Sequence, residues 1–97
     1  MINRSLEGRT AIITGAGRGL GKSMAEGLAA QGVNIALVDL EGDVLARATA
    51  DVEAAGGQGS ALAVSADVTV LDQAQAAINR TIDTFGGLDI LINDAAM

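Results

Sequence analysis

The sequence predicts an α/β domain in which four parallel strands form a doubly wound sheet with helices on both faces. Three observations support this fold class. Short apolar runs alternate with longer segments of helical periodicity, four of the first kind and three of the second. Glycines stand at many of the junctions, where turns and helix ends favour them. The apolar runs are almost unbroken, which is typical of parallel strands buried on both faces.

The first strand is predicted over 10–14, and the first helix is predicted over 20–31. The strand is short and largely apolar. Within the helix, Leu20, Met24 and Leu28 recur at the i, i+4, i+8 spacing of a single helix face. We expect this face to pack against the sheet.

The second strand is predicted over 33–39, where nearly every residue is apolar. The second helix is predicted over 43–54, because glycines at 56 and 57 supply the usual signal for a helix C-terminus. The third strand is predicted over 60–65.

The third helix is predicted over 69–85. Thr69 is the candidate N-cap, and Asp72 three residues later makes an acidic variant of the capping box. The apolar stripe of this helix consists of Ile78, Ile82 and Phe85. The fourth strand is predicted over 88–93.

Parallel strands joined by right-handed crossovers predict the strand order 3-2-1-4. In that order the first two helices share one face of the sheet, and the third helix crosses the other face. The turn after the first strand and the end of the fourth strand should then border the same crevice.

The most informative segment follows the first strand, where residues 14–21 read Thr-Gly-Ala-Gly-Arg-Gly-Leu-Gly. A glycine-rich turn between a strand and a helix directs backbone N–H groups at an anion and lets the anion approach closely. Asp39 ends the second strand, 18 residues after Gly21. An acid at that place binds the ribose hydroxyls of a dinucleotide.

Composition narrows the function further. The 97 residues are expected to form one domain, 1–97. The net charge is −6 and the basic residues are scattered, so binding to nucleic acid is not expected. No apolar run has the roughly 18 residues of a membrane span. The N-terminus resembles no targeting signal, and a cytoplasmic location is expected. Without Cys or His, no metal site is predicted.

The spacing Thr-Gly-x-x-x-Gly-x-Gly over 14–21 resembles the short-chain dehydrogenase/reductase family. Three further motifs match in order along the chain: Asp39, Asp67-Val68, and the segment Asn93-Asp94-Ala95-Ala96. The resemblance covers nearly the whole chain and implies a Rossmann-like fold. It also implies a nicotinamide dinucleotide as cofactor.

The resemblance implies roles for the residues of the turn. Gly15, Gly19 and Gly21 would let the backbone approach the pyrophosphate and start the helix. Arg18 and Leu20 would line the turn, with Arg18 near a phosphate or a ribose.

The later motifs also have implied roles. Asp39 would accept hydrogen bonds from the adenosine ribose, Asp67 would bond the adenine amino group, and Val68 would lie beside the ring. Asn93 would brace the fourth strand, and Ala95 would border the cofactor ribose.

Two residues bear on the choice between NAD and NADP. In this family a basic residue at Arg18 can favour a 2′-phosphate. Asp39 would repel that phosphate by roughly 4 kcal/mol per charge pair at about 4 Å and intermediate dielectric. We therefore expect NAD. The sequence departs from the family pattern at Asp94, where Asn is usual, and at Ala96, where Gly is usual.

The resemblance implies the cofactor-binding N-terminal part of an oxidoreductase that moves a hydride between NAD and an alcohol or carbonyl. The family's catalytic Ser, Tyr and Lys lie beyond the fourth strand, so no catalytic residue is assigned. We expect a chain truncated after that strand, which binds cofactor without catalysis.

The alternative is a free-standing or engineered nucleotide-binding or assembly module. In either case 90–92 would form an apolar sheet edge, which favours a homo-oligomer or a complementing fragment. A methyltransferase-like adenosine site fits the glycine spacing less well.

Overall fold

The computed structural model describes residues 6–40, 42–57 and 60–94. In these residues strands and helices alternate: β1 (Thr10–Thr14), α1 (Gly19–Ala30), β2 (Asn34–Asp39), α2 (Gly42–Gly56), β3 (Ala61–Ser65), α3 (Leu71–Phe85) and β4 (Ile90–Asn93). The four strands form one parallel sheet in the order β3-β2-β1-β4. The α/β fold and the predicted strand order are confirmed.

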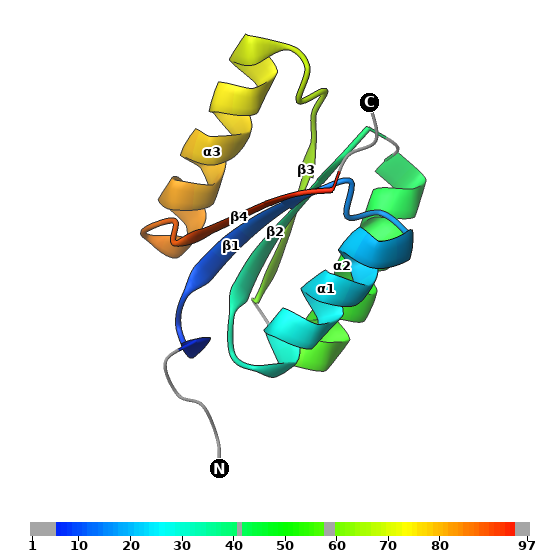
Figure 1. Cartoon of the computed structure of the whole chain (residues 1–97), viewed down its shortest axis with the longest axis vertical. Helices are drawn as coiled ribbons and strands as arrows, with labels where there is room; N and C mark the ends of the chain where they lie inside the picture. The colour runs from blue at the N-terminus through cyan, green and yellow to red at the C-terminus, as the bar shows by residue number, and fades with distance from the viewer. Residues whose placement is uncertain (1–5, 41, 58–59, 95–97) are drawn as a thin grey trace.

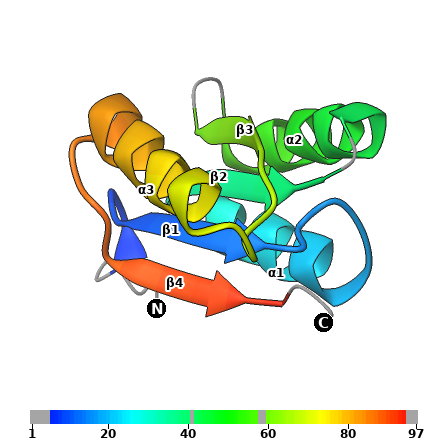
Figure 2. The same cartoon turned by 90° about the horizontal axis from the view of Figure 1, so that it is seen from above.

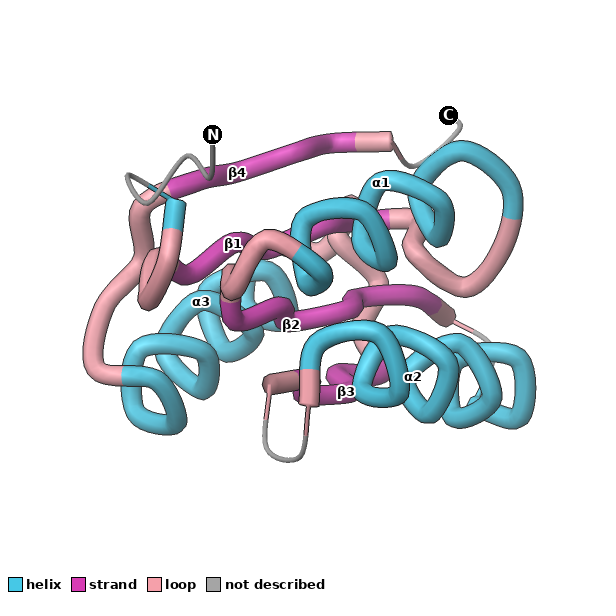
Figure 3. The backbone as a smooth tube through the Cα atoms, turned by 90° about the horizontal axis from the view of Figure 1, so that it is seen from below, coloured by secondary structure: helices cyan, strands magenta, loops and turns pink. Residues whose placement is uncertain are grey.

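The sheet has a helical layer on each side. Helices α1 and α2 cover one face, and α3 lies alone on the opposite face (Figure 1). Figure 2 shows β1, β2 and β4 pointing the same way, and Figure 3 shows β4 and β3 at the two edges. Two separate clusters of buried apolar residues fill the two interfaces. This is the predicted distribution of helices.

The register brings the carboxyl ends of the strands to one edge of the sheet. Thr14 pairs with Val38 and with Asn93, and Asp39 pairs with Ser65. The turns that leave β1, β2 and β3 therefore start close together. This carboxyl edge is the place where open α/β sheets bind their ligands.

The buried face of α1 differs from the predicted one. Gly21, Ala25 and Ala29 are buried, whereas Leu20 is 65% exposed. The reason is the close approach of the helix to the sheet: a Cβ on Gly21 would lie 2.6 Å from the carbonyl oxygen of Gly15. Only small side chains fit there. Of the predicted face, Leu28 still packs against the buried cluster from the side.

Helix α2 packs beside α1, and it begins one residue earlier and ends two residues later than predicted. Its buried face consists of Leu45, Ala48 and Val52. An ion pair joins the two helices, with Lys22 Nζ 2.7 Å from Asp51 Oδ2. The hydrogen bond to Asp51 raises the pKa of Lys22 above its ordinary value.

Helix α3 packs less completely. Ile78 and Phe85 contact the second cluster as predicted, but Ile82 is 41% exposed. The predicted N-cap is wrong: the helix begins at Leu71, and its N-cap is Val70, which makes no side-chain capping bond. The hydroxyl of Thr69 bonds to a carboxylate in the preceding loop instead.

Candidate functional site

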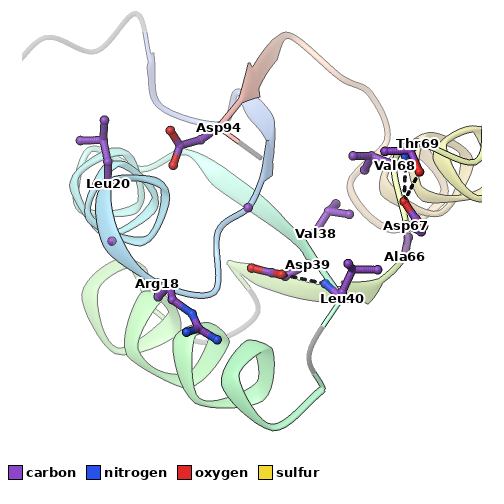
Figure 4. Close-up of a pocket in the computed structure, with 12 residues that line it drawn as sticks. Arg18, Leu20, Val38, Asp39, Leu40, Ala66, Asp67, Val68, Thr69 and Asp94 are labelled. Carbon is purple, nitrogen blue, oxygen red and sulfur yellow. Dashed lines mark hydrogen bonds between the residues drawn. The ribbon is translucent and has the colours of Figure 1, made fainter. Parts of the chain in front are cut away.

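The carboxyl edge contains a hollow of about 360 Å³, here called the main hollow (Figure 4). Its walls come from the turns after β1, β2 and β3 and from the end of β4. The predicted site residues that line it are Gly15, Arg18, Gly19, Leu20, Asp39, Asp67 and Val68. The structure adds Val38, Leu40, Ala66, Thr69 and Asp94. Residues from three separate motifs thus surround one space.

The β1–α1 turn forms the first wall. Gly15 and Gly19 have φ values of +68° and +62°, in the left-handed region that favours glycine. Helix α1 starts at Gly19, and its N-cap residue Arg18 makes no side-chain capping bond. The first N–H groups of a helix have no acceptor within the helix, so this turn is suited to an anion.

Gly21 is a predicted site residue that does not line the main hollow. It is buried where α1 passes the β1 turn, and a Cβ there would also lie 2.9 Å from Asp94 Oδ2. Gly21 therefore acts by allowing close packing. Asp94 is held beside the turn through its own N–H, which donates to the Thr14 carbonyl at 3.2 Å.

Asp39 forms the second wall, and both of its carboxylate oxygens accept backbone hydrogen bonds. The N–H of Gly17 donates to Oδ2 at 2.9 Å. The N–H of Leu40 donates to Oδ1 at 2.7 Å (Figure 4). Gly17 was not among the predicted site residues. The available signal was a fourth glycine in the turn, at a position that the motif leaves free.

Asp67 forms the third wall in the loop before α3. Its Oδ1 accepts hydrogen bonds from the N–H and the hydroxyl of Thr69, at 2.9 and 2.6 Å. These bonds hold the pKa of Asp67 below the 3.8 of an ordinary aspartate, and the bond from the Thr69 hydroxyl has the larger effect. The Asp67 N–H donates to Gln73 Oε1 at 2.7 Å, which ties the loop to α3.

The last two predicted site residues are not brought into the main hollow. Asn93 lines a second hollow of about 440 Å³ between the sheet and α3, here called the α3-side hollow. Its Oδ1 accepts a hydrogen bond from the Thr14 hydroxyl at 2.6 Å, which links β4 to β1. Ala95 lies outside the described residues.

No group of three acidic, His or Cys side chains is arranged to hold a metal ion within 6–40, 42–57 and 60–94. Among those same residues, no helix combines the length and apolar character needed to cross a membrane.

Comparisons with known proteins agree with this geometry. A family model described as short chain dehydrogenase matches residues 9–97. The chain is 41% identical over 92 residues to galactitol 2-dehydrogenase from Agrobacterium fabrum, covering 95% of this chain and 34% of that protein.

Two solved structures show the same fold. A 3-ketoacyl-(acyl-carrier-protein) reductase from Brucella melitensis, complexed with NADH, has a TM-score of 0.81 and 38% identity, covering 90% of this chain and 34% of that one. L-sorbose reductase from Gluconobacter frateurii, complexed with NADPH and L-sorbose, has a TM-score of 0.88 and 34% identity. The match covers 100% of this chain and 36% of that one.

The chain spans about a third of the length of these relatives. The predicted Rossmann-like architecture is confirmed by the sheet order and by the structural similarity. With the family model matching most of the sequence, the chain belongs to the short-chain dehydrogenase family.

Proposed function

We propose that this chain binds the adenosine and pyrophosphate part of a nicotinamide dinucleotide for an oxidoreductase acting on alcohols or carbonyls. One observation carries the proposal: the glycine turn, Asp39 and Asp67 come from three loops and surround a single hollow. The complexes of similar proteins with NADH and NADPH support it. When bound, the nicotinamide ring of such a cofactor donates or accepts a hydride.

The turn after β1 fits a pyrophosphate. No atom lies within 4 Å of where a Cβ of Gly19 would stand, so the approach to the first turn of α1 is open. Gly15, Arg18 and Leu20 complete this wall. Their roles are to present N–H groups and to bring the backbone close to the charge.

The other two walls fit the adenosine. The Asp39 carboxylate has lone pairs beyond those used by its two backbone bonds, and these would accept ribose hydroxyls. Asp67 and Val68 would contact the adenine. Asn93 would act indirectly by fixing β4 to β1, and Ala95 would border the cofactor ribose.

The proposed preference is for NAD over NADP. A 2′-phosphate bound beside Asp39 would place two negative charges together, at a cost of roughly 4 kcal/mol at about 4 Å. Arg18 also lines the main hollow and opposes this repulsion. Because Asp39 lies in the wall with both oxygens tied to the backbone, we expect its charge to dominate.

Titration with NADH and NADPH, followed by nicotinamide fluorescence, tests the proposal. The chain has no Trp or Tyr to interfere. We expect tighter binding of NADH by the native chain and loss of that preference in Asp39→Ala. An unchanged NADH/NADPH ratio in Asp39→Ala would refute the specificity, and no binding of either dinucleotide would refute the site.

We further propose that these 97 residues bind cofactor without catalysing hydride transfer, in a cytoplasmic setting. The sequence has no Tyr, and its single Lys, Lys22, is paired with Asp51 on the surface of α1 and α2. A proton donor for the carbonyl oxygen of the substrate is therefore not assigned to any described residue. Measurable turnover of a simple alcohol with NAD by these residues alone would contradict this.

A partner for β4 completes the proposal. Within the described residues β4 is an edge strand, and Leu91 on it is exposed. We propose that this edge pairs with another strand, from a second copy of the chain or from a complementing segment. Sedimentation velocity of the native chain and of Leu91→Lys distinguishes the cases: a native monomer at high micromolar concentration would exclude pairing between copies.

A further inference from the structure

We propose that Gly17 sets the choice between NAD and NADP by holding the carboxylate of Asp39 in place. The inference rests on the proposed function and deepens it. Gly17 is a positioning residue here, because it acts on the ligand through Asp39. The ligand feature under selection is the 2′ position of the adenosine ribose, a hydroxyl in NAD and a phosphate in NADP.

The first observation is the way in which the carboxylate is anchored. Oδ2 receives the Gly17 N–H at 2.9 Å, and Oδ1 receives the Leu40 N–H at 2.7 Å. One bond comes from the β1–α1 turn and the other from the end of β2. A carboxylate bonded through both oxygens cannot rotate freely, yet each oxygen keeps a lone pair for a hydroxyl.

The second observation explains why residue 17 is glycine. A Cβ at this position would lie 2.6 Å from Asp39 Oδ2 and 3.0 Å from Val44 Cγ1. Gly17 is buried, and it is not among the glycines with positive φ. Glycine is therefore needed for space, in contrast to Gly19, where φ is positive and the space is open.

These contacts decide how Asp39 responds to a 2′-phosphate. A freely rotating carboxylate would turn away and reduce the repulsion. A carboxylate tied to the Gly17 N–H stays where the phosphate must go. The same anchoring prepares the carboxylate for ribose hydroxyls and avoids the entropic cost of ordering it on binding.

Gly17→Ala is the direct test, made in the full chain. The methyl group would displace the end of a flexible side chain, so the fold should survive while the carboxylate moves. We expect weaker NADH binding and about a tenfold fall in the NADH/NADPH affinity ratio, which corresponds to about 1.4 kcal/mol. Gly27→Ala is the matched control, since nothing lies within 4 Å of a Cβ at that exposed position of α1.

A double-mutant cycle shows whether Gly17 acts through Asp39. In an Asp39→Asn background the charge is gone, so adding Gly17→Ala should leave the NADH/NADPH ratio unchanged. A second readout needs no cofactor. Exchange of the Gly17 amide hydrogen should accelerate in Asp39→Ala, while the Gly8 amide, which bonds to the Gly32 carbonyl at 2.9 Å, should stay protected.

If Gly17→Ala does not fold, Val44→Ala is added to make room on the other side of the new methyl group. An unchanged NADH/NADPH ratio in a folded Gly17→Ala variant would overturn the inference while leaving the cofactor site intact. The inference would also be overturned if adding Gly17→Ala to Asp39→Asn lowered the NADH/NADPH ratio as much as it does in the native chain. Failure of the native chain to bind either dinucleotide would overturn the proposed function and this inference together.

Discussion

The two faces of the sheet are built differently. On the α1 and α2 face, small residues on the helices allow close approach, and a continuous buried cluster fills the interface. On the α3 face the buried cluster is smaller, and the α3-side hollow is lined by residues of α3 and of the sheet, β4 included. Leu91 and Ile82 remain exposed there. The first face is therefore packed more completely than the second.

The largest expected effect compares two leucines in strands of the same sheet. Leu37 on β2 is fully buried toward α1 and α2, whereas Leu91 on β4 is 65% exposed. Leu37→Ala should lower the free energy of unfolding by about 2–5 kcal/mol, and Leu91→Ala by less than about 0.5 kcal/mol. Chemical denaturation measures both, and similar losses would show that the two faces do not differ in packing.

The next largest effect is the loss of stability when a larger side chain replaces a buried alanine on each face. Ala25 lies on the buried face of α1, so Ala25→Leu should overpack the interface and destabilise the chain by about 1–3 kcal/mol. Ala77 is buried on α3 but lines the α3-side hollow. Ala77→Leu should therefore be tolerated within about 1 kcal/mol. A larger thermal destabilisation by Ala77→Leu than by Ala25→Leu would reverse the comparison.

A smaller effect concerns charge at the site. Asp94 lines the main hollow near Gly21, so its charge should repel a pyrophosphate at the turn. Asp94→Asn should tighten binding of both dinucleotides about fivefold, or roughly 1 kcal/mol. Asp72→Asn, in the first turn of α3 and outside the main hollow, is the charge-matched control. Weaker binding by Asp94→Asn would mean that the carboxylate has a favourable role.

The smallest effect is a change in the pKa of Asp67, in the loop before α3. Because the folded pKa of Asp67 lies below its ordinary value, its stabilising contribution is present above about pH 3.8 and is lost as the pH falls through the lowered pKa. Thr69→Val should raise that pKa toward the ordinary value. Carbon NMR titration of the Asp67 carboxyl measures this, with Thr49→Val on α2 as the control. An unchanged titration in Thr69→Val would contradict the assignment.

Much of the fold was predictable because it depends on local patterns. The alternation of apolar runs and helical segments, with glycines at the ends, specified the elements and the sheet order. The buried face of α1 was not predictable, because its rotation is set by the contact of Gly21 with the Gly15 carbonyl. Thr69 was misplaced as an N-cap because a hydroxyl near a helix start can also bond a neighbouring carboxylate.

The candidate site was also predictable only in part. The residues that meet in the main hollow were predictable from motifs at strand ends, because parallel strands bring those ends to one edge. The extra glycine at Gly17 was visible in the sequence, but its contact with Asp39 was not predictable, since it joins two turns that are distant in sequence. The side of β4 on which Asn93 lies also depends on strand register, which the motif does not specify.

The most direct test of the proposed site is amide NMR of the native chain during addition of NADH. A dinucleotide at the carboxyl edge should shift the resonances of Gly15, Gly19 and Leu20. Those of Gly8 and Gly32, which are bonded to each other away from the main hollow, should not move. Absence of any shift, or shifts confined to Gly8 and Gly32, would contradict a cofactor site at the glycine turn.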